Sequence, residues 1–178
     1  LKDTNGVVAT TTTDSNGDYS FTNVTLDNLY YLWERLDLKP GWYQTTGPTS
    51  SFSLTSGQIY GDDISEITDF GNFELGSISG EKFHDIKADS IKDVTDDPVP
   101  GVKIELHKWM GGSYQKVGET YTDSGGEYFF TGLPAGTYKV IELPTYPWNV
   151  SYPAMGVNYY QGIVITSGLD VVDKDFGN

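Results

Sequence analysis

The chain has 178 residues, no cysteine and a formal net charge of −14 with a pI near 4.2. The lack of cysteine excludes disulfides and thiol chemistry, and the acidic balance argues against nucleic acid and anionic membranes, which select basic patches. No run of about 18 apolar residues occurs, so no membrane insertion is expected in this segment.

The first recognisable stretch, TTTTDSNGDYSFTNV at residues 10–24, recurs as TYTDSGGEYFFTGLP at residues 120–134. Three anchors follow one another in the same order in both halves, at nearly constant spacings of 109, 108 and 106 residues. Such self-similarity predicts tandem copies of one module. The anchor pairs are Asp14 with Asp123, Glu34 with Glu142, and TDFGN (68–72) with KDFGN (174–178).

The two copies differ at their beginnings. Copy two has a lead-in, SISGEKFHD from Ser77 and then an acidic run, before GVKIELHKW. Copy one starts at Leu1, which aligns with Leu106, so about 25 residues of that lead-in have no counterpart. We therefore expect an incomplete module at 1–75, lacking its N-terminal strand or strands, and a complete one at 76–178.

Strand signals dominate both copies. GVKIELH (101–107) and TYKVIEL (137–143) alternate apolar and polar residues with the period of two of a half-buried strand. Turn sequences such as SNGD, SGGE, LPAG and TSG separate these runs, and no stretch shows a helical period. Short strands joined by such turns in modules of about 100 residues predict all-β sandwiches.

The succession of motifs in copy two is specific. It reads SGxKFxD (79–85), GVxIxL (101–106), TDxxGxYxFTGLPAGTYxVxE (122–142) and DFGN (175–178). This succession resembles the SdrD B-like and Cna B-type modules of prokaryotic surface proteins. The resemblance implies prealbumin-like (Ig-like) β-sandwiches in an extracellular, cell-surface protein, repeated and used as stalks, spacers or parts of adhesins.

The acidic run of copy two has a spacing like that of an EF-hand loop when Asp85 is counted as position 1. Calcium takes roughly six to eight oxygen ligands from flexible acidic loops. Two positions depart from the pattern, because Lys87 has no side-chain oxygen and Ser90 stands where glycine is usual. A solvated acidic turn is the alternative to a Ca²⁺ site. The candidate ligands are Asp85, Asp89, the Ile91 carbonyl, Asp93, Asp96 and Asp97.

Three polar residues, Lys82, Glu142 and Asn178, share strand parity with apolar neighbours and so fall on buried faces. Burying a lysine or a glutamate is costly unless the group is paired or neutral. The resembled Cna B-type modules join such a lysine to such an asparagine by an isopeptide bond, with an acid beside them. The alternative is a buried Lys–Glu ion pair, with Asn178 capping an edge.

The resemblance implies the following self-modification. Burial lowers the pKa of the lysine and raises that of the glutamate, so that a neutral amine attacks the Asn178 carboxamide while Glu142 moves protons. The bond would join residues 96 positions apart, and by analogy with a disulfide it could contribute on the order of 4–5 kcal/mol.

Copy one keeps Glu34 and Asn72 at the matching positions but has no lysine to match. Either the first strand belongs to a part of the protein outside this sequence, or a neighbouring subunit supplies a strand in trans, which would make the open edge an assembly site.

Two N-x-S/T sequences, at Asn23 and Asn149, are candidate glycosylation sites of an exported protein. The four tryptophans favour core and rim positions of a sandwich, although Trp42 or Trp148 could stack on a sugar. The two histidines lie in different expected elements, which gives no pattern for a zinc site or a triad.

The sequence thus predicts a structural, non-enzymatic module pair that serves as a stiff spacer or stalk, or as a subunit of a surface filament or sheath. Its expected partners are neighbouring modules or subunits of the same protein. Calcium, the isopeptide bond and strand donation are the expected stabilising and assembling devices. The alternative function is a carbohydrate-binding or adhesin module pair of a secreted protein, with a glycan or host ligand.

Overall fold

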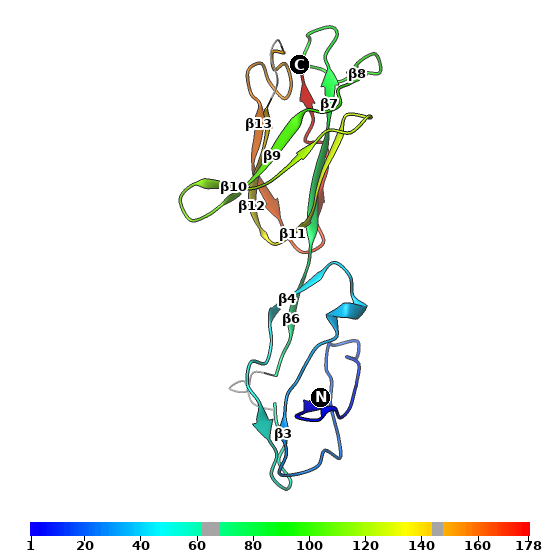
Figure 1. The fold of residues 1–178 in the computed structure, drawn as a ribbon, viewed down its shortest axis with the longest axis vertical. Helices are drawn as coiled ribbons and strands as arrows, with labels where there is room; N and C mark the ends of the chain where they lie inside the picture. Colours follow the sequence, from blue (N-terminus) through cyan, green and yellow to red (C-terminus); the bar gives the residue numbers. More distant parts are fainter. Residues whose placement is uncertain (62–67, 144–147) are drawn as a thin grey trace. The chain divides into compact units, whose positions relative to one another are not determined.

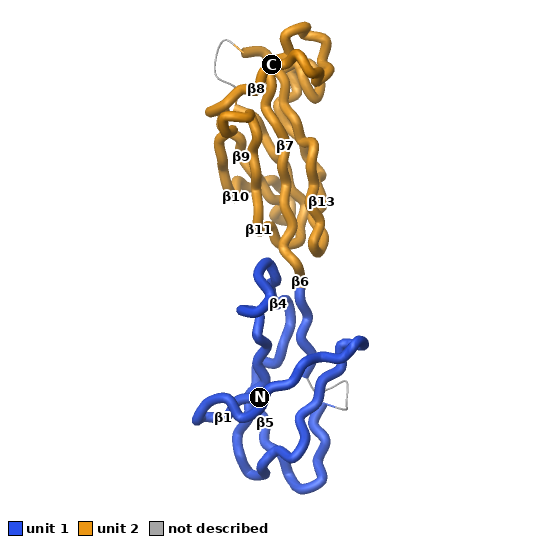
Figure 2. The backbone as a smooth tube through the Cα atoms, turned by 90° about the vertical axis from the view of Figure 1, so that its right-hand side faces the viewer, with its two compact units in different colours: residues 1–72 blue, residues 73–178 orange. Residues whose placement is uncertain are grey.

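The structure, a computed structural model, describes residues 1–61, 68–143 and 148–178. These residues form two compact units, Leu1–Asn72 (unit 1) and Phe73–Asn178 (unit 2), coloured separately in Figure 2. The described parts are built of β-strands, with a single 3-10 turn at Leu36–Leu38 as their helical element. None of them forms a helix long and apolar enough to cross a bilayer. The prediction of an all-β fold is confirmed.

Unit 2 consists of two facing sheets (Figure 1). The first is four-stranded with the order β10-β9-β12-β13, and all its neighbours are antiparallel. Its strands are β9 (Lys103–Trp109), β10 (Tyr114–Tyr121), β12 (Gly136–Leu143) and β13 (Tyr159–Ile165).

The second sheet of unit 2 is organised around its longest strand, β7, which pairs with every other strand of the sheet. β11 and β8 pair with β7 antiparallel, and β14 and β15 pair with it parallel. Its strands are β7 (Gly76–His84), β8 (Asp97–Pro98), β11 (Glu127–Leu133), β14 (Asp170–Val171) and β15 (Phe176–Gly177).

The core of unit 2 lies between these sheets and follows the predicted alternation. Ile104 and Leu106 of β9 are buried while the intervening Glu105 is not, and Tyr138 and Val140 of β12 are buried in the same way. Burial of these alternate side chains provides the main favourable free energy of folding. The remaining core residues are Ile78, Val102, Tyr128, Phe130, Leu133, Ile163, Ile165 and Phe176.

Unit 1 contains shorter strands in three pairs. β1 pairs with β2 and β3 pairs with β5, both antiparallel, and β4 pairs with β6. The strands are β1 (Lys2–Asp3), β2 (Gly6–Val7), β3 (Leu29–Tyr30), β4 (Trp42–Thr46), β5 (Phe52–Ser53) and β6 (Gly71–Glu74), the last of which continues into the first residues of unit 2.

The strand register of unit 1 repeats that of the first sheet of unit 2. Tyr30 lies opposite Phe52, as its counterpart Tyr138 lies opposite Ile163. An isolated bridge places Lys2 opposite Tyr31, as β9 and β12 place His107 opposite Lys139. β2, β1, β3 and β5 therefore occupy the positions of β10, β9, β12 and β13.

The turn at the start of the repeated motif is also the same in both units. The Asp14 carboxylate accepts hydrogen bonds from the backbone N–H groups of Asn16 and Asp18, at 2.8 and 3.0 Å. The Asp123 carboxylate accepts the equivalent bonds from Gly125 and Glu127, at the same two distances. An aspartate that closes a local turn in this way explains why this residue type recurs there.

Candidate cross-linking site

The three polar residues predicted to lie on apolar faces are brought together inside unit 2. Lys82 is on β7, Glu142 is on β12 of the facing sheet, and Asn178 follows β15. The residues are 1%, 0% and 8% exposed, respectively. The site therefore lies between the sheets and connects the first long strand of the unit with its last residue.

Strand pairing fixes this arrangement. β15 runs parallel to β7, with Phe176 opposite Lys82. The pairing continues to the last residue, because the Asn178 N–H donates to the Phe83 carbonyl at 3.2 Å and the Asn178 carbonyl accepts from the Asp85 N–H at 2.9 Å. Asn178 is thus held by its backbone on both sides.

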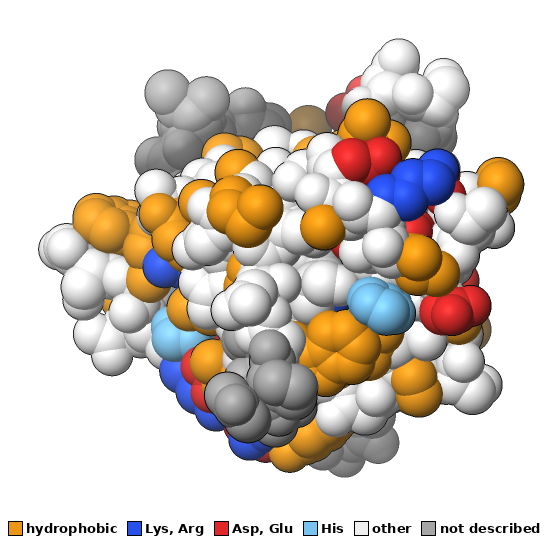
Figure 3. Space-filling model, turned by 90° about the horizontal axis from the view of Figure 1, so that it is seen from above, with side chains coloured by type: hydrophobic (Ala, Val, Ile, Leu, Met, Phe, Trp, Pro, Cys, Tyr) orange, Lys and Arg blue, Asp and Glu red, His pale blue; other side chains and the backbone are white. Residues whose placement is uncertain are grey.

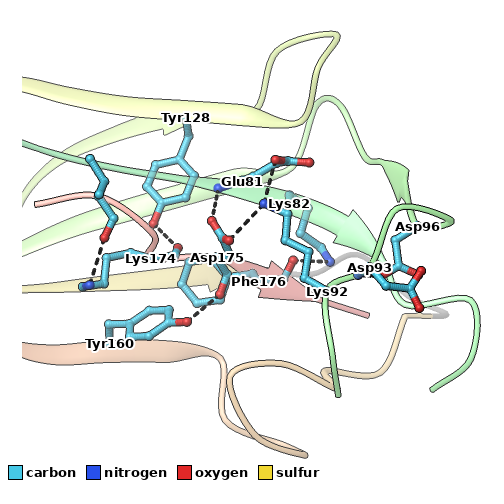
Figure 4. Close-up of polar contacts among 11 residues, drawn as sticks. Glu81, Lys82, Lys92, Asp93, Asp96, Tyr128, Tyr160, Lys174, Asp175 and Phe176 are labelled. Atoms are coloured by element: carbon cyan, nitrogen blue, oxygen red, sulfur yellow. Dashed lines mark hydrogen bonds and ion pairs between the residues drawn. The ribbon is translucent and has the colours of Figure 1, made fainter. Parts of the chain in front are cut away.

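Glu142 is the centre of the polar contacts. Its Oε1 lies 3.6 Å from Lys82 Nζ and accepts a hydrogen bond from Asn178 Nδ2 at 3.1 Å. Lys82 Nζ also donates to the Phe83 carbonyl at 2.8 Å and to the Phe176 carbonyl at 3.3 Å, the second contact being drawn in Figure 4. The amine and the carboxamide therefore share one carboxylate oxygen as a neighbour.

Two oxygens of this site are buried without a hydrogen-bond partner among the described residues, Glu142 Oε2 and Asn178 Oδ1. Leaving a buried acceptor unpaired costs about 1–3 kcal/mol. Both acceptors therefore carry a desolvation cost that no contact among the described residues offsets.

Burial changes the protonation of both ionisable groups. Desolvation lowers the pKa of Lys82 to about 8, although the neighbouring Glu142 carboxylate opposes the change. Desolvation likewise raises the pKa of Glu142, against the effects of Lys82 and Asn178. A larger share of the amine is therefore neutral at physiological pH than for a lysine in water, and the carboxyl is more readily protonated.

Two tyrosines that the sequence did not single out hold the last strand over this site. The hydroxyl of Tyr128 donates to the Lys174 carbonyl at 2.6 Å, and that of Tyr160 donates to the Asp175 carbonyl at 2.8 Å, as Figure 4 shows. Burial raises the pKa of Tyr160 above the ordinary value of a tyrosine, so its hydroxyl stays a donor. The period of two along β11 could have identified Tyr128 as a buried residue, since Tyr128 and Phe130 lie two positions apart and are both buried.

A surface lysine, Lys92, links β7 to the residue that precedes β15 on the solvent-exposed side of the sheet. Its Nζ lies 2.8 Å from Glu81 Oε2 and 3.0 Å from Asp175 Oδ2, between the two carboxylates in Figure 4. Glu81 belongs to β7 and Asp175 directly precedes β15. This contact is partly exposed to solvent, so it contributes much less than the buried site.

In the acidic run, the carboxylates accept hydrogen bonds from the run's own backbone. Asp85 accepts from the N–H groups of Asp89 and Ser90 at 3.2 and 2.9 Å, and Asp89 accepts from Ile91 at 3.0 Å. Asp96 accepts from the N–H groups of Ile86 and Asp93.

The described residues contain no group of three or more acidic, histidine or cysteine side chains close enough together to hold a metal ion. Lys87 forms an ion pair with Asp93, where a bound cation would need that carboxylate. Ser90, at the position expected to carry glycine, has a φ of +61°. As arranged here, the residues do not fit Ca²⁺, and the calcium site stays a prediction.

Unit 1 has the matching acid and amide. Asn72 Nδ2 donates to Glu34 Oε1 at 2.6 Å, as Asn178 does to Glu142. Glu34 Oε2 and Asn72 Oδ1 are buried without a hydrogen-bond partner among the described residues, as their counterparts are. Unit 1 thus repeats the acid–amide half of the site of unit 2.

The remaining predicted positions are at the surface. Asn23 and Asn149 are exposed, whereas Ser151 of the second N-x-S sequence is 4% exposed. The four tryptophans are 38–48% exposed, so they are rim residues and the expectation that some lie in the core is wrong. On the face seen in Figure 3, hydrophobic, acidic and basic side chains are interspersed.

Residues 76–161 match the family model of the SdrD B-like domain. The chain is 34% identical over 149 residues to the serine-aspartate repeat-containing protein E of Staphylococcus aureus (strain Mu50 / ATCC 700699), covering 79% of the chain and 12% of that protein. It is 35% identical over 156 residues to protein D of the strain Newman, covering 82% of the chain and 11% of that protein. The chain thus spans about a tenth of these relatives.

Among solved structures, the chain is similar to BcpA, the major pilin subunit of Bacillus cereus, with a TM-score of 0.37 and 23% identity over 58% of this chain and 28% of that one. It is also similar to GBS52, the minor pilin of Streptococcus agalactiae, with a TM-score of 0.38 and 15% identity over 93% of this chain and 66% of that one. Likeness at this level carries no conclusion by itself.

The family match and the relatives agree with the motifs of the sequence and confirm the resemblance to surface-protein modules. They also confirm the expected extracellular, cell-surface location. Residues 76–161 thus correspond to an SdrD B-like domain.

Proposed function

We propose that the chain is a load-bearing, non-enzymatic module pair of an extracellular surface protein, acting as a spacer, stalk or filament subunit between neighbouring modules. We further propose that an isopeptide bond between Lys82 and Asn178 seals unit 2. The observation that carries this proposal is the buried contact of Lys82 and Asn178 with the same oxygen of Glu142.

The bond forms by displacement of ammonia. The neutral Lys82 Nζ attacks the Asn178 Cγ, a new Nζ–Cγ bond forms, and the Cγ–Nδ2 bond breaks. Glu142, which is protonated when the amine is neutral, gives its proton to the leaving Nδ2 and takes one from the attacking nitrogen, so that it is protonated again in the product. Because burial lowers the pKa of Lys82 and raises that of Glu142, both groups are prepared for these exchanges.

The product would satisfy the buried oxygens that lack partners. A protonated Glu142 accepts the N–H of the new amide with one oxygen and donates from the other to the Asn178 carbonyl. Glu142 Oε2 and Asn178 Oδ1, which have no partner among the described residues, would then both be paired. The charged amine would also disappear from the core, where a charge is costly.

The strand order suits a unit that is pulled along its length. β7 and β15 are parallel, and the chain enters β7 at one end of unit 2 and terminates at the other (Figure 1). Tension between these points shears the β7–β15 hydrogen bonds together rather than opening them one by one. A Lys82–Asn178 bond would lie across this same pair of strands.

Mass spectrometry of the intact, denatured chain tests the bond. The wild-type mass is expected to fall about 17 Da below the value calculated from the sequence, because one ammonia is lost. Lys82→Met and Glu142→Gln should each have the calculated mass. A wild-type mass without the deficit would remove the bond from the proposal, and Asn72→Ala, at the matching position of unit 1, serves as a control that retains the deficit.

Calcium in the acidic run is a separate proposal, supported by the spacing of its aspartates. Binding requires Asp93 to leave Lys87 and the carboxylates to converge. Chelation with EGTA is then expected to lower the melting temperature of the wild type but not that of Asp93→Ala. An identical melting temperature with EGTA and with added Ca²⁺ would show that the run is a turn held by its own hydrogen bonds.

A further inference from the structure

The backbone offers the Lys82 amine two hydrogen-bond acceptors. Its Nζ lies 2.8 Å from the Phe83 carbonyl and 3.3 Å from the Phe176 carbonyl. Glu142 Oε1, at 3.6 Å, is beyond normal hydrogen-bond distance. A charged ammonium has three N–H donors, whereas a neutral amine has two and a lone pair. The two carbonyls therefore match the neutral amine, since they accept from both of its N–H groups and leave its lone pair free for attack.

One of these two acceptors belongs to the strand that leads to the reacting amide. Phe83 lies on β7, whereas Phe176 lies on β15, two residues before Asn178. A displacement of β15 along β7 would therefore move the Phe176 carbonyl away from the amine and Asn178 away from Glu142 at the same time. A reaction between two groups held in contact loses rate steeply when either is displaced. The contacts that fix β15 thus affect both reactants.

Two tyrosine hydroxyls fix the residues just before β15, one from each sheet. Tyr128 of β11 donates to the Lys174 carbonyl at 2.6 Å, and Tyr160 of β13 donates to the Asp175 carbonyl at 2.8 Å, as drawn in Figure 4. Both rings also lie against that of Phe176, with centroid distances of 6.1 and 5.4 Å. The segment that leads into β15 is therefore tied to both sheets at successive peptide groups.

The first of these bonds recurs in unit 1 at the same place in the repeated motif. The Tyr19 hydroxyl donates to the Thr68 carbonyl at 2.5 Å. Thr68 precedes Asn72 by four residues, as Lys174 precedes Asn178. In both units the asparagine donates to a buried glutamate oxygen. The recurrence connects the tyrosine with the placement of the asparagine.

Other contacts hold β15 in the sandwich independently of the tyrosines. Gly177 forms a β-bridge with Tyr152, and its N–H donates to the Tyr152 carbonyl at 3.2 Å. On the other side, β15 pairs with β7. Removal of a single tyrosine hydroxyl should therefore leave unit 2 folded and change only the placement of its last residues.

We propose that the hydroxyls of Tyr128 and Tyr160 are positioning groups for the cross-linking of unit 2. They hold the last strand where its backbone orients the amine and where the carboxamide meets Glu142. This inference rests on the proposed Lys82–Asn178 bond and concerns the rate at which that bond forms. The tyrosines exchange no proton with the reacting atoms. The Nζ–Cγ bond forms, the Cγ–Nδ2 bond breaks, ammonia leaves, and Glu142 alone moves the protons.

A time course of bond formation tests this role. The full chain is made by cell-free synthesis, samples are stopped with denaturant at intervals, and intact-mass spectrometry follows the appearance of the deficit of about 17 Da. Tyr128→Phe and Tyr160→Phe keep the rings and remove the hydroxyls. Each should slow the reaction roughly 2- to 12-fold, the factor that corresponds to one hydrogen bond of this kind. The double variant should be slower than either.

Tyr138→Phe is the matched control. The Tyr138 hydroxyl donates to the Pro134 carbonyl at 2.7 Å, and its residue is as buried as Tyr128, but neither Tyr138 nor Pro134 contacts β15 through this bond. In a Lys82→Met background, which cannot form the cross-link, Tyr138→Phe and Tyr128→Phe should lower the melting temperature alike. With Lys82 present, only Tyr128→Phe should slow the appearance of the deficit.

The outcomes separate this inference from the bond on which it rests. Equal rates of bond formation in the wild type, Tyr128→Phe and Tyr160→Phe would overturn the positioning role and leave the bond in place. An equal slowing in Tyr138→Phe would also overturn it, because the rate would then follow general stability. A wild-type chain that never shows the deficit would remove the bond and this inference together.

Discussion

Lys82→Met is expected to lower the melting temperature of unit 2 by about 16–40 °C. By analogy with a disulfide, a bond that closes a loop of 96 residues contributes on the order of 4–5 kcal/mol, and for a domain of this size each kcal/mol corresponds to about 4–8 °C. Methionine keeps most of the aliphatic packing of the lysine, so the decrease in melting temperature measures the loss of the bond rather than the creation of a cavity. Differential scanning calorimetry measures the effect.

Lys92→Met is the matched control for this prediction. It removes a lysine that also connects β7 with the last strand, but through partly exposed ion pairs with Glu81 and Asp175. Such pairs contribute about 0–1 kcal/mol. If Lys82→Met and Lys92→Met shifted the melting temperature equally, the buried site would have no covalent contribution.

The strand faces of unit 2 could be predicted from the sequence because the period of two is a local property. Ile104, Leu106, Val140 and Glu142 are buried, as alternation predicts. Periodicity could not predict that Lys82 lies near Asn178, because this proximity depends on which strands are neighbours in the sheet. The resemblance to a known family supplied that information.

Other features depend on three-dimensional neighbours and left no readable signal. Gly80 appears in the sequence as a small residue within a strand, and only the sheet order shows that Tyr128 and Lys174 meet above it. Residues 19–24 carry the strand signals of β11 yet form no strand. Strand formation requires a partner for the backbone groups, and a residue propensity does not show whether the described residues offer one.

The acidic run shows the reverse case, in which a local alternative competes with the predicted site. Spacing suggested ligands for Ca²⁺, but the same aspartates accept hydrogen bonds from backbone N–H groups two to five residues away. Aspartate does this readily in turns. Acid spacing therefore predicts a compact acidic turn as well as it predicts a metal site.

Single-molecule pulling is expected to give an all-or-none difference between the wild type and Lys82→Met. When force is applied between residues 76 and 178, a Lys82–Asn178 bond places the load on a covalent path. The 95 residues between Lys82 and Asn178 then lie outside the loaded path, so their unfolding does not lengthen the molecule. Without the bond, their extension adds about 30–35 nm, at roughly 3.3–3.6 Å per residue.

Lys82→Met should still resist force before it extends, because the parallel β7–β15 pair is loaded in shear. Lys92→Met, which retains the buried site, should release no length from unit 2. A wild-type trace that showed the full release would mean that Lys82 and Asn178 remain unbonded. Unit 2 would then depend on strand pairing alone, and a role in bearing permanent load would lose its physical basis.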